Sequence, residues 1–205
     1  DRAERLLVPT LHFRYRDRVG NADLSVFMQD TFGVEPEQTV AAIRLAWDAQ
    51  AAFETACRVR GTEVLANLPT DKESVVLLGR PYNTGDPQLN LELVDKLIGQ
   101  DVMPIPVDFL PLDEVEIFPQ YTMVCWPNGQ KLMAAAKYVA QHPALNAVYM
   151  SNFRCGPDSF LSHYIREEIR AKPYLQLEVD EHSADAGMIT RIEAFLDSLR
   201  GSRTV

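Results

Sequence analysis

One loop of this 205-residue sequence places a cysteine where it could do chemistry. Residues 151–159 read SNFRCGPDS, so the thiol of Cys155 comes directly before a predicted helix whose first turn is marked by Pro157. Gly156 permits a close backbone approach at this point. A helix N-terminus favours the thiolate, which is the form of cysteine that acts as a nucleophile or binds soft metals. On residue types alone, a buried and inert cysteine is the commoner alternative.

A second polar loop follows the first predicted strand. Residues 79–86 read GRPYNTGD, which matches neither the dinucleotide-binding nor the phosphate-loop glycine pattern. Arg80 and Asn83 could hold an anion or a neighbouring loop. Turn formation and hydrogen bonds between loops are the favoured explanation for both residues.

A third loop, residues 178–185, gathers carboxylates and a histidine. They are Glu178, Asp180, Glu181, His182 and Asp185. These side chains could bind a divalent cation, act in acid–base chemistry, or cap a helix that begins near Ser183. Capping is the favoured interpretation, because the spacing matches no standard metal-binding motif.

The other thiols and histidines carry less signal. Cys125 precedes another predicted helix and is the second candidate ligand, whereas Cys57 lies among apolar residues of a helix and is expected to be packing. His12, His142 and His163 have no acidic or thiol companion at ligand spacing. One or two thiols cannot hold a four-iron cluster, which needs four ligands, so any cluster must draw ligands from elsewhere. No catalytic triad or Cys–His pair can be assigned, because the proximity of Cys155 and His182 is only inferred.

The elements that position these loops alternate between strands and helices. Short β-branched or apolar runs predict strands, and periodic runs predict helices between them. The predicted strands are 75–78, 102–107, 147–150 and 174–179, and the predicted helices are 88–98, 129–141, 159–170 and 183–199. This alternation favours a three-layer α/β/α sandwich on a mostly parallel, Rossmann-like or flavodoxin-like sheet of about four strands. Ligands of such sheets bind beyond the carboxyl ends of the strands, where the three polar loops lie.

The first third of the chain differs from this pattern. Residues 1–35 show no long period of either kind, and residues 37–60 form an amphipathic helix that starts at Pro36 and stops at Gly61. We therefore expect residues 1–70 to be an arm and long helix that pack on the core, and residues 71–205 to be a parallel α/β domain. Since the sequence starts at Asp1 rather than Met, we expect it to be an excised part of a longer polypeptide.

Charge and hydropathy exclude two classes of partner. The net charge of −9 repels nucleic-acid phosphates, and the most basic stretch, residues 14–18, is interrupted by an aspartate and is expected to be a solvated surface. No apolar run approaches the roughly 18 residues of a membrane helix. Three cysteines without paired spacing suit a reducing compartment. We expect a cytoplasmic protein without nucleic-acid or membrane partners.

Four segments together carry a resemblance to a known family. They are VVLLGRPYN, SNFRCGPDSF, KPYLQLEVDEHSADAG and TRIEAFLD. The sequence resembles the activator-like proteins related to 2-hydroxyacyl-CoA dehydratases, in the region after their ATPase modules that is labelled a CoA-substrate-specific enzyme activase or a domain of unknown function. The resemblance spans residues 9–199 and is specific from residue 75 onward.

The resemblance implies a part of a larger iron–sulfur protein. The full-length proteins combine acetate-kinase-like ATPase domains with dehydratase-like lobes, and related dehydratase subunits hold a 4Fe-4S cluster between two Rossmann-like lobes. By this resemblance Cys155 is the contributed metal ligand, whereas Cys125 has no counterpart. The cofactor-binding residues expected around it are Arg80, Asn83, Asn152, Gly156, Asp158, Ser159, Glu178 and His182.

The resemblance also limits what this chain can do. The sequence has no ATPase phosphate loop and no partner lobe with further cysteines, so no catalytic residue is assigned and the cluster is expected only in the full-length protein. The expected partners are the ATPase modules and the second dehydratase-like lobe of the same polypeptide. The leading hypothesis is one lobe of a protein for ATP-coupled, low-potential electron transfer. The alternatives are a docking module without a cofactor, or a lobe that binds a CoA ester or another anion in the strand-end cleft.

Overall fold

Residues 6–11, 21–180, 182, 183 and 185–202 are described by a computed structural model of the chain. The basic stretch 14–18, His12 and Glu181, which figure in the sequence analysis, lie outside these residues. The chain divides into two units, residues 1–56 and residues 57–205, and each is described by itself. The arm and the domain boundary near residue 70 stay predictions.

Helix α1, Asn21–Phe32, occupies part of the N-terminal arm, where the sequence indicated no regular element. The rings of Phe27 and Phe32 meet edge to face with their centroids 6.3 Å apart. Val26 and Phe32 are exposed, so the apolar side chains of α1 do not gather on one buried face. The segment therefore lacks the single apolar stripe by which an amphipathic helix is recognised in a sequence.

Helix α2, Pro36–Ala66, begins at the predicted residue but continues past Gly61, where the sequence predicted its end. Gly61 is buried, and a Cβ atom at this position would lie 2.0 Å from the carbonyl oxygen of Phe109. This glycine allows the 3-10 turn Val107–Phe109 (η3) to approach the helix, and it does not terminate the helix. Val64, in the last turns of α2, packs on the core of the second unit.

The second unit is built on a four-stranded, all-parallel sheet. Its strands are β1 (Glu73–Gly79), β2 (Val102–Pro106), β3 (Leu145–Asn152) and β4 (Tyr174–Val179). They lie in the order β2-β1-β3-β4, which is flavodoxin-like and confirms the predicted fold class. β2 carries two prolines and lies at one edge, where a missing N–H donor is tolerated.

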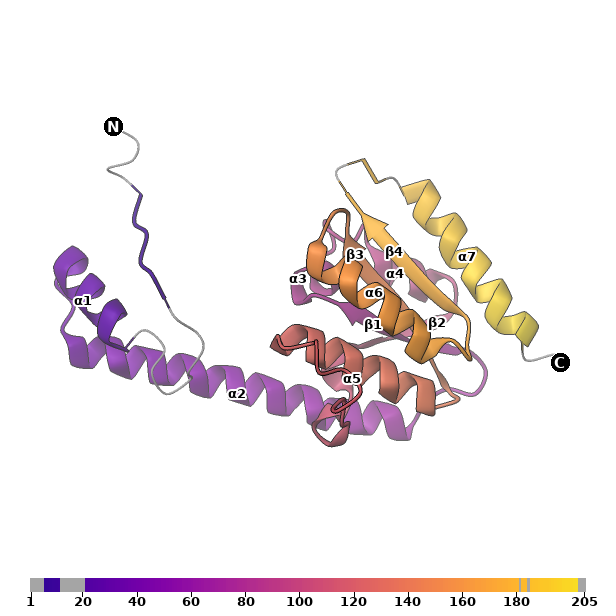
Figure 1. The fold of residues 1–205 in the computed structure, drawn as a ribbon, viewed down its shortest axis with the longest axis horizontal. Helices are drawn as coiled ribbons and strands as arrows, with labels where there is room; N and C mark the ends of the chain where they lie inside the picture. Colours follow the sequence, from indigo (N-terminus) through magenta and orange to yellow (C-terminus); the bar gives the residue numbers. More distant parts are fainter. Residues whose placement is uncertain (1–5, 12–20, 181, 184, 203–205) are drawn as a thin grey trace. The chain divides into compact units, whose positions relative to one another are not determined.

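Helices cover both faces of this sheet (Figure 1). The helices are α3 (Pro81–Gly85), α4 (Leu93–Gly99), α5 (Pro127–Gln141), α6 (Gly156–Ile169) and α7 (Asp185–Ser202). α5 and α6 pack on the face that presents Val76 and Tyr149. α4 and α7 pack on the face that presents Val75 and Val148. The alternation of buried side chains along each strand thus produces two apolar layers, one on each side of the sheet.

The predicted helix 88–98 is shorter than expected. Asp86 accepts hydrogen bonds from the backbone N–H groups of Gln88 and Leu89, which holds a turn. Leu91 and Glu92 then adopt positive φ angles of 52° and 55°, so regular helix starts only after them.

The long connection from β2 to α5 contains η3 and a second 3-10 turn, η4 (Leu112–Glu114). None of the helices in the described part of the chain combines the length and the apolar character needed to cross a membrane.

Candidate functional site

The sheet order brings two of the predicted loops to one place. β1 and β3 are hydrogen-bonded neighbours, with Gly79 paired to Met150 at their carboxyl ends. A Cβ atom at Gly79 would lie 2.9 Å from the carbonyl oxygen of Met150, so glycine is what lets the two strand ends lie this close. The chain leaves β1 toward one edge and β3 toward the other, which makes this the switch point where open α/β sheets bind ligands.

Arg80 joins the two loops at this switch point. Its Nε donates to Oδ1 and Oδ2 of Asp158, at 3.2 and 3.4 Å. Its terminal nitrogen lies 3.5 Å from Sγ of Cys155 and donates a hydrogen bond to the sulfur. Asp158 is 1% exposed and Arg80 is 22% exposed, so this is a largely buried ion pair. Three residues that the sequence analysis singled out on two separate loops are therefore in direct contact.

The surroundings of Arg80 and Tyr149 determine the protonation states of these two side chains. Burial lowers the pKa of the Arg80 guanidinium, but Asp158 and Cys155 outweigh that effect and raise the pKa above its ordinary value, so Arg80 stays cationic. Burial and the nearby charge of Asp158 raise the pKa of Tyr149, which keeps its phenol neutral. The Tyr149 hydroxyl lies close enough to Asp158 to feel that charge, yet no hydrogen bond of normal geometry joins them.

A tight turn presents the cysteine. The N–H of Cys155 donates to the carbonyl of Asn152 at 3.1 Å, and Arg154 inside the turn has φ +60°, which is unfavourable for a side chain. Cys155 is the N-cap of α6 and is half-buried. The hydroxyl of Ser159 donates to the Cys155 carbonyl at 2.9 Å. Asn152 and Ser159 thus hold the backbone of Cys155 from both sides. Gly156 is exposed with open space around it, so no close approach within the described residues uses it.

Buried polar atoms surround the same strand ends. Asn83 is fully buried, and neither its amide nitrogen nor its amide oxygen has a hydrogen-bond partner among the described residues. The hydroxyls of Tyr149 and Ser151 share that state. Such groups are costly unless something satisfies them. The sequence analysis found Asn83, placed Ser151 in a polar loop without assigning it a role, and missed Tyr149; the alternation along β3 places Tyr149 and Ser151 on the α6 side.

The second candidate thiol lies on the same rim. Cys125 is exposed and precedes Trp126, the N-cap of α5. The Trp126 ring packs against Phe160 in the first turns of α6, with centroids 6.0 Å apart. Cys57 is half-buried in α2. Within the described residues, no group of three or more His, Cys, Asp or Glu side chains could hold a metal ion.

The third loop is organised as a turn before α7. Asp180 accepts from the N–H of His182 at 2.9 Å, and the Ser183 hydroxyl bonds both the N–H and the carboxylate of Asp180. These hydrogen bonds lower the pKa of Asp180, which is fully exposed. His182 is also exposed, and Glu178 points into a hollow at the open edge of β4. Glu178 pairs with Ser151 at the carboxyl end of β3, and the cofactor role of Glu178 and His182 stays a prediction.

Comparison with known proteins decides the family. The family described as CoA enzyme activase uncharacterised domain (DUF2229) matches residues 1–110, more than half of the chain. The chain belongs to this family. The resemblance to activator-like proteins is thereby confirmed. The matched part of the activase domain contains Arg80 and Asn83 and ends before Cys155 and Asp158. No curated protein and no solved structure gives a significant match.

Proposed function

We propose that this CoA enzyme activase domain forms one lobe of a larger protein and supplies Cys155 as one ligand of a shared 4Fe-4S cluster. The proposal depends on one observation, which is the hydrogen bond from Arg80 to the Cys155 sulfur at the β1/β3 switch point. This contact presents a half-buried thiol at the rim where parallel sheets bind ligands. An inert packing cysteine has no need of a cationic donor.

The residues present fit the contribution of a single ligand. The described part of the chain has no cluster of three ligating side chains, so a second lobe has to supply the rest. When bound, the cluster would supply low-potential electron transfer, coupled to ATP use in the ATPase modules of the same polypeptide. Hydrogen bonds to cluster sulfurs tune the reduction potential, and Arg80 is placed to provide one.

The neighbouring residues have supporting roles in this proposal. Asp158 fixes the Arg80 guanidinium, and Asn152 and Ser159 fix the backbone of the cysteine. Asn83 offers, at the adjacent strand end, an amide that has no hydrogen-bond partner among the described residues. Cys125, exposed on the same rim, is the second thiol that this lobe could lend. The three free cysteines also favour a cytoplasmic location, where thiols stay reduced.

Anaerobic loading of the parent polypeptide with iron and sulfide tests the proposal. We expect Cys155→Ser to lose most of the bound iron and the visible iron–sulfur absorption, because one ligand is removed. Cys57→Ser is the matched control and keeps both, since Cys57 lies in α2. Cys125→Ser then shows whether the second rim thiol takes part.

Urea unfolding of the 205-residue chain separates ligation from folding. Cys155→Ser should unfold at the wild-type urea concentration, because the side chain is half-exposed and nearly isosteric. Unchanged iron content in Cys155→Ser contradicts the proposal. Failure of the wild type to take up iron, with the partner lobe present, favours the docking module instead.

A further inference from the structure

A hollow lies along the open edge of the sheet, away from the β1/β3 switch point. β4 is the outermost strand on this side of the sheet. The hollow has a volume of about 730 Å³, which lies within the usual range for small-molecule sites. Leu175, Leu177 and Val179 are buried against the α7 side of β4. The alternate residues Gln176 and Glu178 lie on the other side and line the hollow. α6 leaves this half of the edge strand uncovered.

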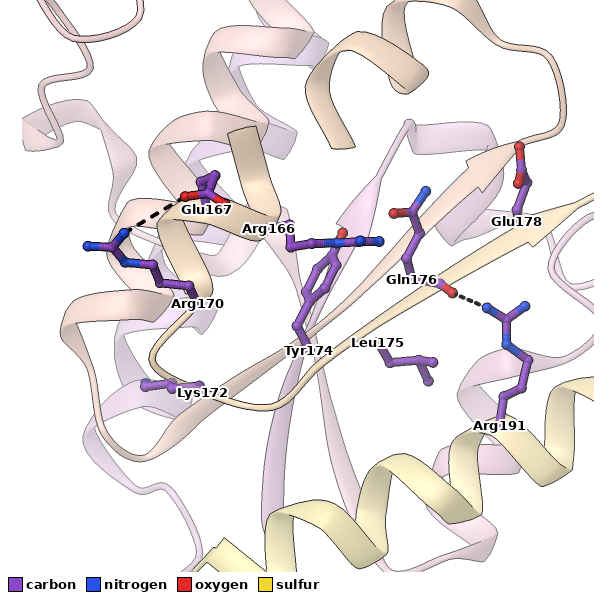
Figure 2. Close-up of a pocket in the computed structure, with 9 residues that line it drawn as sticks. All are labelled: Arg166, Glu167, Arg170, Lys172, Tyr174, Leu175, Gln176, Glu178 and Arg191. Carbon is purple, nitrogen blue, oxygen red and sulfur yellow. Dashed lines mark hydrogen bonds and ion pairs between the residues drawn. The ribbon is translucent and has the colours of Figure 1, made fainter. Parts of the chain in front are cut away.

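Cationic side chains dominate the lining. Arg166 and Arg170 come from α6, Arg191 comes from α7, and Lys172 comes from the turn before β4 (Figure 2). Two carboxylates, Glu167 and Glu178, oppose these four cations. This local excess of positive charge contrasts with the net charge of −9 of the whole chain, and it favours an anionic ligand at this place.

Several of these cations are already engaged. The ammonium of Lys172 donates to three carbonyls, those of Val139, His142 and Leu145, and so closes the end of α5. Arg170 forms an exposed ion pair with Glu167, with N and O 3.8 Å apart. Neither residue is free to lead the binding of a ligand.

Two guanidinium groups remain available. Arg166 makes no hydrogen bond or ion pair with any other described residue, and Figure 2 shows its side chain extending toward Gln176. Arg191 donates one N–H to the carbonyl of Gln176 at 2.7 Å and keeps further donors. That bond occupies an edge carbonyl of β4, which opposes the addition of a peptide strand and favours a small ligand.

Tyr174 offers a neutral donor in the same hollow. The Tyr174 hydroxyl is shielded from solvent and has no hydrogen-bond partner among the described residues. Burial raises the pKa of Tyr174, although the charge of Arg166 opposes that effect, so the phenol keeps its proton.

We propose that the β4-edge hollow binds the phosphate group of a small phosphate ester, held by Arg166 and Arg191 with the Tyr174 hydroxyl and the Gln176 amide as neutral donors. A phosphate presents several acceptor oxygens, which suits donors that converge from α6, α7 and β4. Planar guanidinium groups bind phosphate in a bidentate manner, which makes arginine the fitting residue at both flanks. The site is independent of Cys155 and of any cluster.

Calorimetric titration of the 205-residue chain with pyrophosphate and with ADP tests this site. We expect Arg166→Gln and Arg191→Gln each to weaken binding by about tenfold or more, because each loses a charge-assisted contact. Arg154→Gln is the matched control, since it removes the same charge from the switch-point turn at the N-terminal end of α6, and it should bind as the wild type does. Affinity should fall as salt rises.

Three results would overturn the proposal. The first is that neither probe binds. The second is that Arg154→Gln weakens binding as much as Arg166→Gln does, which would move the anion to the N-terminus of α6. The third is that citrate, a polycarboxylate, binds more tightly than pyrophosphate. Circular dichroism confirms that each variant is folded, so a loss of binding reports on the site.

Discussion

Arginine and acidic side chains lie near both ends of α6, but they are buried and paired at one end and exposed at the other. At its N-terminal end, the Arg80–Asp158 pair is largely buried, and its geometry is fixed by the strand ends of β1 and β3. Along its C-terminal flank, Arg166 and Arg170 are exposed above an edge strand, and the acids only partly balance them. A buried charge must be paired within the protein, so it orients a neighbour such as Cys155. An exposed and unpaired charge is available to a ligand.

Breaking the buried pair should have the largest effect. Asp158→Asn leaves the Arg80 guanidinium without its counter-charge, and we expect a loss of about 2 kcal/mol in the free energy of unfolding. The estimate is below that for a fully buried pair, because Arg80 is partly exposed. Glu167→Gln is the control at the other end of α6. Its ion pair with Arg170 is exposed, and its loss should cost less than about 0.5 kcal/mol. Urea unfolding measures both, and equal losses would remove the distinction between the two ends.

Removing a hydroxyl should distinguish tyrosines whose hydroxyl has a hydrogen-bond partner from those whose buried hydroxyl has none among the described residues. Tyr149→Phe deletes a buried hydroxyl that has no partner among the described residues, so we expect a gain of about 1 kcal/mol in the free energy of unfolding. Tyr174→Phe should behave similarly at the β4-edge hollow, yet weaken phosphate binding. Tyr121→Phe is the contrast, since its hydroxyl donates to Glu168 and its loss should destabilise the protein by about 1 kcal/mol. A loss of stability in Tyr149→Phe would mean that the Tyr149 hydroxyl donates a hydrogen bond to the Asp158 carboxylate in solution.

Two arginines that flank α6 provide the smallest and most local test. Arg154 has φ +60°, so Arg154→Gly should raise the free energy of unfolding by about 0.5 kcal/mol as the turn relaxes. Arg170 ends the same helix with φ −50° and ψ −24°, which are right-handed helical angles. Arg170→Gly should therefore lower the free energy of unfolding by about 0.5 kcal/mol. Opposite signs in thermal unfolding would confirm that the turn at Arg154 is strained and that the helix end at Arg170 is not. The Arg154 guanidinium lies 5.2 Å from the centroid of the Phe153 ring, so a loss of stability in both variants would show that this contact outweighs the relaxation of the turn.

The sequence predicted the strands better than the helix ends. Continuous apolar runs located β1 and β3, and both extend only a little beyond the predicted residues. Gly61 misled the prediction, because a glycine that terminates a helix and one that admits a neighbouring backbone look alike in sequence. The hollow was missed as well, although the alternation of Leu with Gln176 and Glu178 in β4 is the pattern of a strand with one uncovered face.

The candidate site was predicted in part. Arg80, Asp158 and Cys155 were chosen from loop composition and family resemblance, and the structure brings them into contact. Glu178 and His182 were chosen for the same reason, and their role stays a prediction. Glu178 pairs with Ser151 in the sheet, and its side chain lines the hollow at the β4 edge. Tyr149 was overlooked because a polar residue inside an apolar strand carries no loop signal, whereas Ser151 was counted in the polar loop without a role of its own.

Local patterning by itself determined that this chain alternates strands and helices and that a cysteine stands before a helix, because side-chain periodicity and cap residues act over a few neighbouring positions. Only the tertiary structure decided that β1 lies beside β3, and hence that Arg80 reaches a sulfur 75 residues away in sequence. Strand order is set by the packing of whole layers, which no short window of sequence contains.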